Sequence, residues 1–459
     1  MRIAVLGAGP GGYVAALRAA RQGAEVTVVE SSEVGGTCLN HGCIPTKTML
    51  ASTELYRKVR EFEQFGLELN GTVTPNLSRI IERKRKVIEV QIKGIRSLFK
   101  SWGVKLRKGR GRIVGERRLL VEGDDGGEME ADRIIVATGS RPADIPAFPF
   151  DGENIITSTE ALELTDIPKS LLIVGGGVIG CEFACIYNAL GTDVTIVELL
   201  PRVLSTEDEE ISKIFERELK KQKIKLYTEA RAEKVVIDEN GVHTTLSNGK
   251  EIVTEKVLVS IGRAFNTDDI GLEDVGIEKT DRGSIKVNTR METSLPGVFA
   301  IGDVTGGMML AHTAYREAQV AVSNIMGIDT EMDYSVVPAA VFTSPEIASV
   351  GLREHQVRDR GIDYVTGHFQ FRALGKAHAI GEITGMVKVI GEKSSDKLLG
   401  VHIIGPHASD LIHEAALALQ AGLKVKDIAE TIHAHPTLSE GLMEAAEDVH
   451  GEAVHVPKR

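Results

Sequence analysis

The stretch from Ile3 to Glu30 decides the fold and reads IAVLGAGPGGYVAALRAARQGAEVTVVE. It combines an apolar strand, a Gly-x-Gly-x-x-Gly turn, an amphipathic helix, a glycine break and a second apolar strand that ends in an acid. This order predicts a strand–helix–strand unit that binds a dinucleotide, with the pyrophosphate at the N-terminus of the helix. One such motif is a weak signal by itself, because a chain with 48 glycines can contain it by chance.

The same pattern occurs a second time between Leu172 and Glu198, as LIVGGGVIGCEFACIYNALGTDVTIVE. In both copies the closing acid lies twenty-three residues after the first glycine, from Gly7 to Glu30 and from Gly175 to Glu198. This offset is close to the roughly 20 residues that dinucleotide-binding units show. Two units with the same internal spacing therefore predict two dinucleotide sites.

Each glycine of the two motifs has its own steric role. The first glycine permits a tight turn, the second lets the pyrophosphate approach the backbone, and the third lets helix and strand pack closely. The acid at the end of the second strand can accept hydrogen bonds from the hydroxyl groups of a ribose. The residues in these roles are Gly7, Gly9, Gly12 and Glu30 in the first unit, and Gly175, Gly177, Gly180 and Glu198 in the second.

The order of the strands predicts a nucleotide domain inserted into another domain. Further apolar strands occur in RIIVATGSRP, before the second unit, and in GVFAIGDVTGG, after it, and we expect both to extend the first unit. The fold class is therefore α/β, with two Rossmann-like nucleotide-binding domains and a C-terminal α+β domain. We expect the first domain at residues 1–145 and 265–335, the inserted domain at 146–264 and the C-terminal domain at 336–459.

Composition argues against several classes of protein. The net charge of −11 and the 4% of aromatic residues predict no nucleic-acid partner. No run of eighteen apolar residues is present, so we expect no membrane span. The chain opens on MRIAVLGAGPGG without the features of a secretory signal, and four cysteines are too few for a disulfide scaffold. We therefore expect a cytoplasmic protein, in which a disulfide would be catalytic.

Two cysteines, Cys38 and Cys43, follow the first unit in VGGTCLNHGCIPTK. Their spacing is compatible with inert buried thiols, a structural bridge, part of a zinc site or a redox dithiol. No other cysteine pair lies near enough in sequence to complete a zinc site, and a bridge over so short a loop contributes little stability. A cysteine just before a helix N-terminus has a stabilised thiolate, which suits redox chemistry. Cys181 and Cys185 lie on the apolar helix of the second unit and are expected in its core.

Three further charged or titratable residues are candidates for function. In HAHPTLSEG, Glu440 could orient the ring of His435 if the intervening residues form a turn, and a His held by an acid suits general-base catalysis. His433 is less suited to be the base, although it lies close in sequence. Glu182 lies among apolar neighbours on the second unit's helix, where a buried carboxylate needs a partner.

These motifs together resemble one family. GGTCLNHGCIPTK is similar to the active-site signature of the flavoprotein disulfide reductases, also called pyridine nucleotide-disulfide oxidoreductases, and IGDV and HPTLSE are similar to further motifs of that family. The order of motifs matches over most of the chain, from residue 1 to about 450. The resemblance implies an FAD domain with an inserted NAD domain, FAD and NAD as cofactors, and a C-terminal dimerisation domain. It also implies a homodimer whose active site is shared between the subunits.

The resemblance assigns roles residue by residue. Cys38 and Cys43 would form the redox disulfide, with Cys38 exchanging with substrate and Cys43 facing the flavin. His435 would be the base and Glu440 its orienting acid, while Lys47 and Glu182 would pair beside the flavin ring. The FAD contacts would be Gly7, Gly9, Gly12, Glu30, Lys47, Gly111, Thr138, Gly139, Asp303 and Ala311. The NAD contacts would be Gly175, Gly177, Gly180, Glu182, Glu198, Ala230 and Gly262, and no metal is expected.

Three features favour one branch of the family. Glu198 accepts a free ribose 2′-hydroxyl and repels a 2′-phosphate, which favours NAD over NADP. No cysteine follows Cys185, unlike in mercuric reductases, and the Cys38–Cys43 pair is absent from relatives that work through one cysteine. We therefore expect oxidation of protein-bound dihydrolipoamide to lipoamide with reduction of NAD⁺. The expected partners are lipoyl domains of 2-oxoacid dehydrogenase complexes or the glycine-cleavage H protein; another NAD(P)H-dependent FAD disulfide or metal-ion reductase is the alternative.

Overall fold

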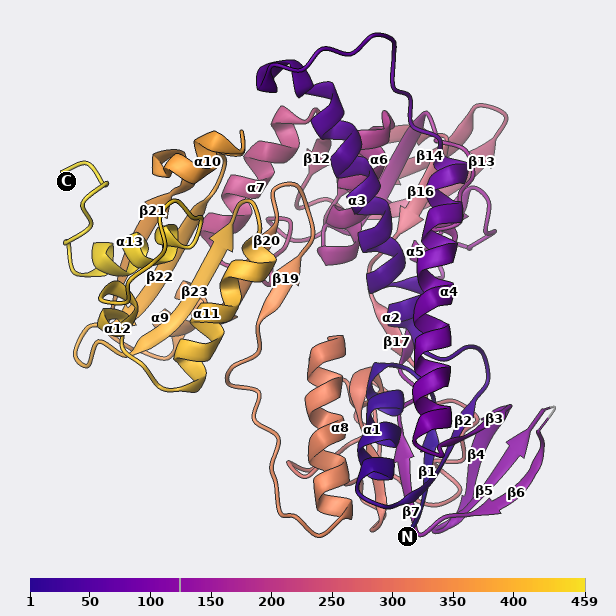
Figure 1. Ribbon diagram of the computed structural model, residues 1–459. Coiled ribbons are helices and arrows are strands. Elements are labelled where there is room, and N and C mark those ends of the chain that lie inside the picture. Colours follow the sequence, from indigo (N-terminus) through magenta and orange to yellow (C-terminus); the bar gives the residue numbers. More distant parts are fainter. Residues whose placement is uncertain (124, 459) are drawn as a thin grey trace. The chain divides into compact units, whose positions relative to one another are not determined.

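The computed structural model describes residues 1–123 and 125–458, and the chain forms two compact units (Figure 1). The first unit contains Met1–Phe150, Thr157–Asp166 and Ile261–Asp333. The second contains Asp151–Ile156, Ile167–Ser260 and Tyr334–Arg459. The predicted α/β fold class is confirmed, whereas the bounds of the four segments expected from the sequence stay a prediction.

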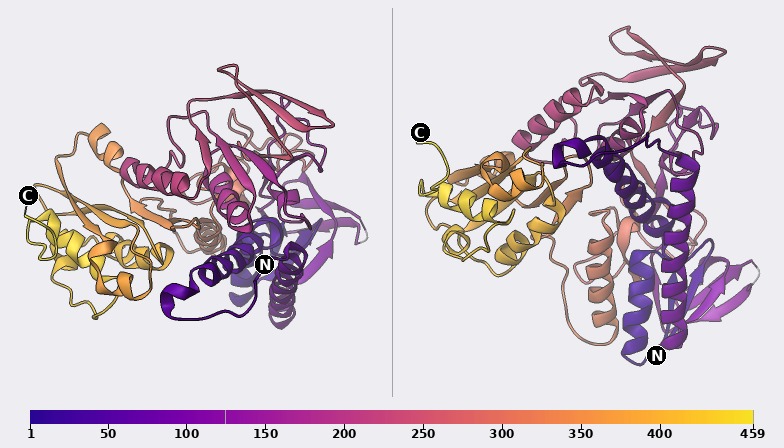
Figure 2. Two further views of the ribbon diagram at one scale, coloured as in Figure 1. Left: turned by 90° about the horizontal axis from the view of Figure 1, so that it is seen from above. Right: turned by 45° about the horizontal axis from the view of Figure 1, so that its top comes forward.

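The first unit is built on a parallel five-stranded sheet of order β18-β7-β1-β2-β3. One face of the sheet packs on helices, of which α1 and α8 lie side by side (Figures 1 and 2). The other face packs on an antiparallel sheet, so the central strands β1 and β7 are apolar and buried on both faces apart from their first residues. The strands are β1 (Arg2–Leu6), β2 (Glu25–Glu30), β3 (Lys105–Lys108), β7 (Arg133–Val136) and β18 (Val298–Ala300), the helices α1 (Pro10–Arg21), α4 (Leu77–Ser101) and α8 (Ala311–Ile325), and the second sheet β4 (Arg110–Gly115), β5 (Arg118–Glu122) and β6 (Gly127–Glu130).

Further elements of the first unit carry the predicted redox residues. Two helices follow β2, and a short antiparallel pair, β8 with β17, joins the point where the chain leaves this unit to the point where it returns. These elements are α2 (Gly36–His41), α3 (Cys43–Arg60), η1 (Phe62–Phe65), β8 (Ser140–Pro142), α5 (Ser158–Ala161), β17 (Arg263–Phe265) and η2 (Gly302–Thr305).

The second unit begins with another parallel five-stranded sheet, of order β12-β11-β10-β16-β9. Its three central strands occupy the same relative places as β2, β1 and β7 in the first sheet, so the sequence repeat extends to the whole sheet. A three-stranded antiparallel sheet precedes β16, as one precedes β7. The elements are β9 (Ile155–Ile156), β10 (Ser170–Val174), α6 (Val178–Leu190), β11 (Asp193–Val197), α7 (Glu209–Lys221), β12 (Lys225–Tyr227), β13 (Ala232–Asp238), β14 (Gly241–Leu246), β15 (Glu251–Thr254) and β16 (Lys256–Val259).

The C-terminal part of the second unit is an antiparallel sheet of order β19-β20-β23-β22-β21. Apolar residues on one face, such as Val389 and Val401, pack on α11 and α13. The strands are β19 (Ala339–Val341), β20 (Ile347–Gly351), β21 (Tyr364–Gln370), β22 (Met386–Glu392) and β23 (Leu398–Ile404), and the helices are α9 (Glu354–Asp359), η3 (Phe371–Ala373), α10 (Gly375–Ala379), α11 (Ala408–Gln420), α12 (Val425–Ala429) and α13 (Glu440–Val449). In the described parts of the chain, no helix combines the length and the apolar character that a membrane span needs.

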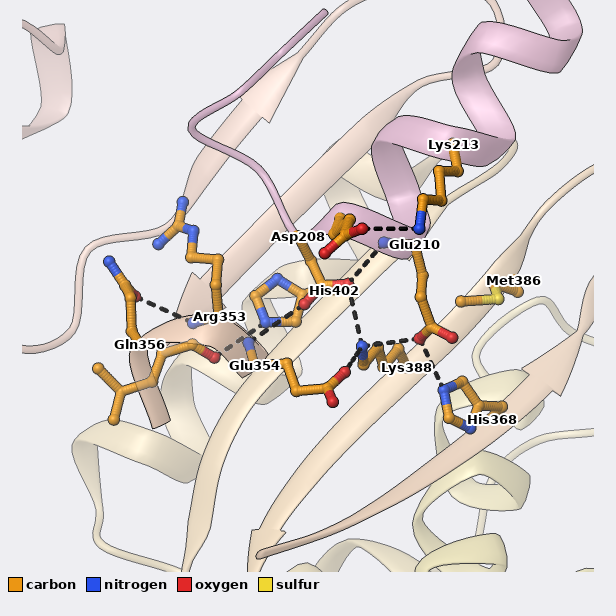
Figure 3. A network of polar contacts seen from close by, with 12 residues as sticks. Asp208, Glu210, Lys213, Arg353, Glu354, Gln356, His368, Met386, Lys388 and His402 are labelled. Carbon is orange, nitrogen blue, oxygen red and sulfur yellow. Dashed lines mark hydrogen bonds and ion pairs between the residues drawn. The ribbon is translucent and has the colours of Figure 1, made fainter. Parts of the chain in front are cut away.

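The opposite face of this sheet buries polar residues, among them His402 on β23 (Figure 3). The ring of His402 is fully buried, and its Nε2 donates to the carbonyl oxygen of Leu352 at 3.0 Å. Burial disfavours the imidazolium and lowers the pKa of His402 to about 4, although the nearby Asp208 carboxylate opposes this shift. The protein therefore folds with a neutral histidine at this position.

We expect acid to destabilise the fold through His402. The unfolded chain binds a proton near pH 6.5 and the folded chain only near pH 4, so the free energy of unfolding falls as the pH falls through this window. Between pH 6.5 and 5 the expected loss is about 2 kcal/mol. Urea unfolding of the wild type and of His402→Gln, which cannot titrate, measures the difference. Parallel pH profiles of the two proteins would contradict this assignment.

Candidate functional site

The first glycine motif forms an open helix N-terminus at the end of β1. Gly7 has a φ of +96°, which only glycine adopts readily, and a Cβ added to Gly12 would lie 1.9 Å from the Gly7 carbonyl oxygen. Helix α1 begins at Pro10 after Gly9, and among the described residues no side chain caps it. The first N–H groups of the helix can therefore donate to a phosphate.

The second motif repeats this geometry at the end of β10. Gly175 has a φ of +108°, and a Cβ on Gly180 would lie 2.0 Å from the Gly175 carbonyl oxygen. A Cβ added to Gly177, the N-cap of α6, would meet no described atom within 4 Å. The space that a pyrophosphate needs is thus present beside the helix N-terminus.

The two acids are held in the same way. Glu30 accepts hydrogen bonds from the N–H groups of Ala8 and Ser32, both at 2.7 Å. Glu198 accepts from the N–H groups of Gly176 at 2.5 Å and of Leu200 at 2.8 Å. A carboxylate has about four acceptor positions, so each acid can still accept from a ribose while its backbone donors fix its direction. Both sites fit the adenosine half of a dinucleotide.

Three of the other residues predicted to contact FAD follow the carboxyl ends of β7 and β18: Thr138 and Gly139 after β7, and Asp303 after β18. The Thr138 hydroxyl donates to the Asn266 carbonyl at 2.8 Å, and the Asn266 N–H donates to the Gly139 carbonyl at 3.0 Å. Ala311 is the first residue of α8. Gly111 on β4 is required by packing, because a Cβ there would lie 2.1 Å from the Leu6 side chain.

Asp303 lies in a polar group that the sequence did not predict. The Ser140 hydroxyl donates to Asp303 at 2.5 Å, and the Arg263 guanidinium donates to the same hydroxyl at 2.7 Å and lies 3.8 Å from Asp303. Burial lowers the pKa of Arg263, whereas Asp303 and Cys43 favour its charged form. Arg263 therefore places a positive charge in the surroundings of the dithiol. Its only sequence signal was its position directly after Gly262.

The two cysteines lie on consecutive helices and contact each other. Cys38 is part of α2 and half-buried, whereas Cys43 is the first residue of α3 and exposed. A hydrogen bond with Cys43, together with burial, raises the pKa of the Cys38 thiol, and Lys47 opposes this rise. Cys38 therefore holds its proton firmly, while the position of Cys43 at the N-terminus of α3 favours negative charge at its sulfur. Within the described residues, no group of three or more His, Cys, Asp or Glu side chains could hold a metal ion.

Two tyrosines lie close to this pair, although the sequence did not mark them. The hydroxyls of Tyr13 on α1 and Tyr315 on α8 are 2.9 Å apart, and their rings meet edge to face. Burial, the Tyr13 hydroxyl and the two cysteines raise the pKa of Tyr315, which keeps its phenol neutral. Tyr13 follows the third glycine of the motif, but nothing in the sequence around Tyr315 indicated its place.

The candidates of the second unit are positioned by α6 and by the loops around β11. Glu182 is buried on α6 and accepts a hydrogen bond from the N–H of Phe342 at 3.0 Å, which supplies the partner that its burial requires. Ala230 donates its N–H to the Glu198 carbonyl at 3.0 Å. Lys47 belongs to the first unit, so its expected pairing with Glu182 remains a prediction.

The C-terminal histidine is oriented as the sequence predicted. His435 Nδ1 lies 2.8 Å from Glu440 at the start of α13, and the His435 side chain is 77% exposed. Burial opposes the ionisation of Glu440, but hydrogen bonds from the Thr437 N–H and His435 outweigh it and lower its pKa. An ionised Glu440 accepts from Nδ1, so Nε2 is the ring nitrogen that can take a proton.

His433 has a different environment from His435. Its side chain is only 5% exposed, its Nε2 lies 2.9 Å from Glu414, and its Nδ1 lies 2.8 Å from the Thr431 carbonyl. The bond with Glu414 raises the pKa of His433, although burial opposes the rise. Because both ring nitrogens are occupied, His433 is poorly placed to act as a base.

Comparison with known proteins relates the chain to one family along its whole length. Residues 1–318 match the family described as pyridine nucleotide-disulphide oxidoreductase, and residues 337–446 match its dimerisation domain. A dihydrolipoyl dehydrogenase from Thermus scotoductus is 42% identical over 461 residues, which cover 99% of this chain and 98% of that protein. One from Halobacterium salinarum is 40% identical over 465 residues, which cover 100% of this chain and 98% of the relative.

Solved structures show the same likeness. The crystal structure of LpdA from Mycobacterium tuberculosis has a TM-score of 0.92 and 32% identity, and the match covers 97% of this chain and 99% of that one. The HOCl-induced flavoprotein disulfide reductase RclA from Escherichia coli has a TM-score of 0.88 and 25% identity, with 97% and 99% of the two chains covered.

Substitution of Gly180 by alanine should remove dinucleotide binding from the second unit while flavin stays bound to the first. The added Cβ forces α6 away from β10, at a cost of about 1–3 kcal/mol in the free energy of unfolding. Calorimetric titration with ADP-ribose and flavin absorbance check the two outcomes. Gly177→Ala is the matched control: it should keep the melting temperature and still weaken ADP-ribose binding, because its methyl group enters the open space. Normal ADP-ribose binding by Gly180→Ala would contradict the role of this contact.

Proposed function

The chain belongs to the pyridine nucleotide-disulphide oxidoreductase family, and we propose that it oxidises protein-bound dihydrolipoamide to lipoamide with reduction of NAD⁺ through the Cys38–Cys43 pair. It is a flavin-dependent oxidoreductase that acts on a sulfur group, and its cofactors are FAD and NAD. The observation that carries the proposal is the direct contact between the two thiols at the N-terminus of α3. When bound, FAD supplies a two-electron acceptor for the dithiol and NAD⁺ supplies the final hydride acceptor.

In the proposed reaction, the first step opens a Cys38–Cys43 disulfide. Nε2 of His435 removes a proton from the first thiol of dihydrolipoamide, while Glu440 holds the ring and stabilises the imidazolium that forms. The substrate thiolate attacks the Cys38 sulfur, so a substrate–Cys38 bond forms and the Cys38–Cys43 bond breaks. The electron pair of the broken bond stays on Cys43 as a thiolate, which the N-terminus of α3, Lys47 and Arg263 stabilise.

The second step releases the product. The second thiol of the substrate attacks the sulfur that is bound to Cys38, forming the disulfide of lipoamide and breaking the bond to Cys38. Cys38 leaves with the electron pair and takes up the second thiol's proton, in agreement with its raised pKa. The substrate has then lost two electrons and two protons: the electrons are on the Cys38–Cys43 dithiol, one proton is on Cys38 and the other on His435.

The remaining assignments complete the proposal. Glu198 selects NAD⁺ over NADP⁺, because a carboxylate accepts from a 2′-hydroxyl and repels a 2′-phosphate. The dimerisation domain supports a homodimer in which His435 serves the dithiol of the other subunit. We assign the lipoyl domains of 2-oxoacid dehydrogenase complexes or the glycine-cleavage H protein as carriers of the substrate. The scarcity of cysteines favours the reducing cytoplasm.

Anaerobic reduction of the purified holoprotein by dihydrolipoamide tests the reaction. We expect a long-wavelength absorbance band from the Cys43 thiolate beside the flavin, together with NAD⁺-dependent turnover of dihydrolipoamide. Cys43→Ser should retain FAD and lose at least roughly a hundredfold of this turnover, because a serine cannot form the disulfide. Bleaching of the flavin without the long-wavelength band would argue against the dithiol. A preference for NADPH would favour another disulfide or metal-ion reductase.

Substitution of His435 by Gln should slow reduction by dihydrolipoamide by about 10²- to 10⁴-fold, because the substrate thiol loses its base. The oxidation of NADH with an artificial electron acceptor needs no substrate thiol and should change little. Stopped-flow absorbance of the flavin measures the first rate and steady-state assays the second. His433→Gln is the matched control, since His433 is bonded to Glu414, and it should affect the dithiol reaction far less. Equal losses in both reactions for His435→Gln would contradict its role as base.

A further inference from the structure

A row of polar side chains crosses the C-terminal sheet on the face opposite α11 and α13 (Figure 3). Ser349 on β20 lies opposite His402 on β23, His402 lies opposite Lys388 on β22, and Lys388 lies opposite His368 on β21. Lys388 and His402 are fully buried and Ser349 nearly so. A buried ammonium is costly unless counter-charges surround it, so the neighbours of Lys388 explain why it is there.

The counter-charges come from two different parts of the second unit. Lys388 Nζ lies 3.0 Å from Asp208 Oδ1, 2.7 Å from Glu210 Oε2 and 2.5 Å from Glu354 Oε2 (Figure 3). Glu354 belongs to the C-terminal part, on α9, whereas Asp208 and Glu210 form the N-terminus of α7 beside the second nucleotide motif. Asp208 is 1% exposed and also accepts from the Glu354 N–H at 3.2 Å. Lys388 thus joins the C-terminal sheet to the chain that leads away from β11.

The two residues before Asp208 are held by the same sheet. The Ser349 hydroxyl donates to the buried Glu207 carboxylate at 2.6 Å, and Arg353 Nη2 lies 3.6 Å from the other oxygen of this carboxylate. Arg353 Nε donates to the Thr206 carbonyl at 3.0 Å. Three consecutive residues, from Thr206 to Asp208, are therefore fixed through charged or hydrogen-bonded contacts.

The other end of this loop contacts the second nucleotide motif. The N–H of Leu204 donates to the Gly176 carbonyl at 2.8 Å, and a Cβ added to Gly176 would lie 2.7 Å from Val203 Cγ1. Leu204 has a φ of +48°, a conformation that costs energy for a branched apolar residue and that persists only when its surroundings impose it. The N–H of the same Gly176 donates to Glu198, the acid that faces the ribose. The loop from Leu199 to Glu207 therefore spans the distance between the ribose acid and the Lys388 cluster.

We propose that Lys388 is a positioning residue for NAD⁺, which acts by clamping the Leu199–Glu207 loop against Gly176 and thereby fixing the direction of the Glu198 carboxylate. This inference rests on the proposed function of the second motif as the NAD site. Without the ammonium, the buried carboxylate of Asp208 faces the carboxylates of the more exposed Glu210 and Glu354 with no cation between them, and Asp208 moves away from the sheet. Ser349 and Arg353 still hold Thr206 and Glu207, but the end of the loop loses the charge contact at Asp208. The loop then presses less firmly on Gly176, and the hydrogen bond from the Leu204 N–H to the Gly176 carbonyl weakens.

Binding of ADP-ribose to the holoprotein tests this role without any redox reaction. Lys388→Met keeps the apolar stem of the side chain and removes its charge, and we expect the Kd for ADP-ribose in isothermal titration calorimetry to rise roughly tenfold. The KM for NAD⁺ should rise with it, while the rate of flavin reduction by dihydrolipoamide stays within about twofold of the wild type. If Lys388 only stabilised the fold, its substitution would lower the melting temperature. It would not raise the KM for NAD⁺ while leaving the rate of flavin reduction by dihydrolipoamide unchanged.

Lys84 supplies a matched control in the first unit. It is also a fully buried lysine, and it binds the Leu162 carbonyl and Glu163 on the α4 side of that unit. Lys84→Met should lower the melting temperature and leave the Kd for ADP-ribose unchanged. If Lys388→Met and Lys84→Met both lower the melting temperature and neither changes this Kd, the positioning role is wrong.

A charge-balanced variant covers the case in which Lys388→Met does not fold. Lys388→Met with Glu354→Gln removes one half-buried acid together with the ammonium, and it should fold while it still binds ADP-ribose more weakly than the wild type. Wild-type affinity in this variant would overturn the proposal. Failure of the proposed function is seen separately, as a wild-type protein that binds ADP-ribose but does not oxidise dihydrolipoamide.

Discussion

Contact between the first and third glycine of each motif is the constraint on which both nucleotide sites depend. A single Cβ at Gly12 or Gly180 would lie about 2 Å from a backbone oxygen, so no other residue lets the helix start directly at the end of the strand. This close approach aims the helix N-terminus at the sheet edge, where phosphate can bind. The residue after the first glycine then donates its N–H to the acid at the end of the second strand. Ala8 donates to Glu30 in the first unit, and Gly176 donates to Glu198 in the second. Steric exclusion at one atom thus determines where an anion and a ribose can bind.

The dithiol uses the same physical principle at another helix. Cys43 begins α3, so the peptide dipoles and N–H groups favour negative charge at this sulfur, while the hydrogen bond between the thiols leaves the proton on Cys38. The two cysteines therefore lie in different electrostatic environments although they are only five residues apart. Arg263 adds a cation from a segment more than two hundred residues later, where the chain returns to the first unit. The N-terminus of α3 contributes to the electrostatic field at Cys43 from neighbouring residues, and Arg263 contributes from a segment far along the chain.

Buried charge in the second unit serves a different purpose. Lys388 satisfies acids from the nucleotide-binding part with an ammonium from the C-terminal part, and such a cluster tolerates little displacement because the fully buried ammonium would lose its counter-charges. An apolar contact of equal area would also stabilise the packing of the α7 N-terminus on the C-terminal sheet, but it would fix the position of Asp208 less strictly. The loop between β11 and α7 is held at one end by a backbone bond to Gly176 and at the other by this cluster. In the proposed role of Lys388, the position of Glu198 therefore depends on residues far along the chain.

The sequence by itself determined those features that arise within short segments. The strand–turn–helix geometry of both glycine motifs and the turn that brings Glu440 to His435 agree with the structure, because each depends on residues within one unit or one turn. The predicted helix near the cysteines begins at Cys43 itself, and Cys38 lies on a short helix of its own. Lys388 and Lys84 would be assigned to the surface from their type alone, and Arg263 and Tyr315 carried no local signal. Their roles come from contacts between segments separated by tens to hundreds of residues, which no pattern of neighbouring residues encodes. Only the tertiary structure decided them, since a buried charge acquires its meaning from the counter-charges that folding brings to it.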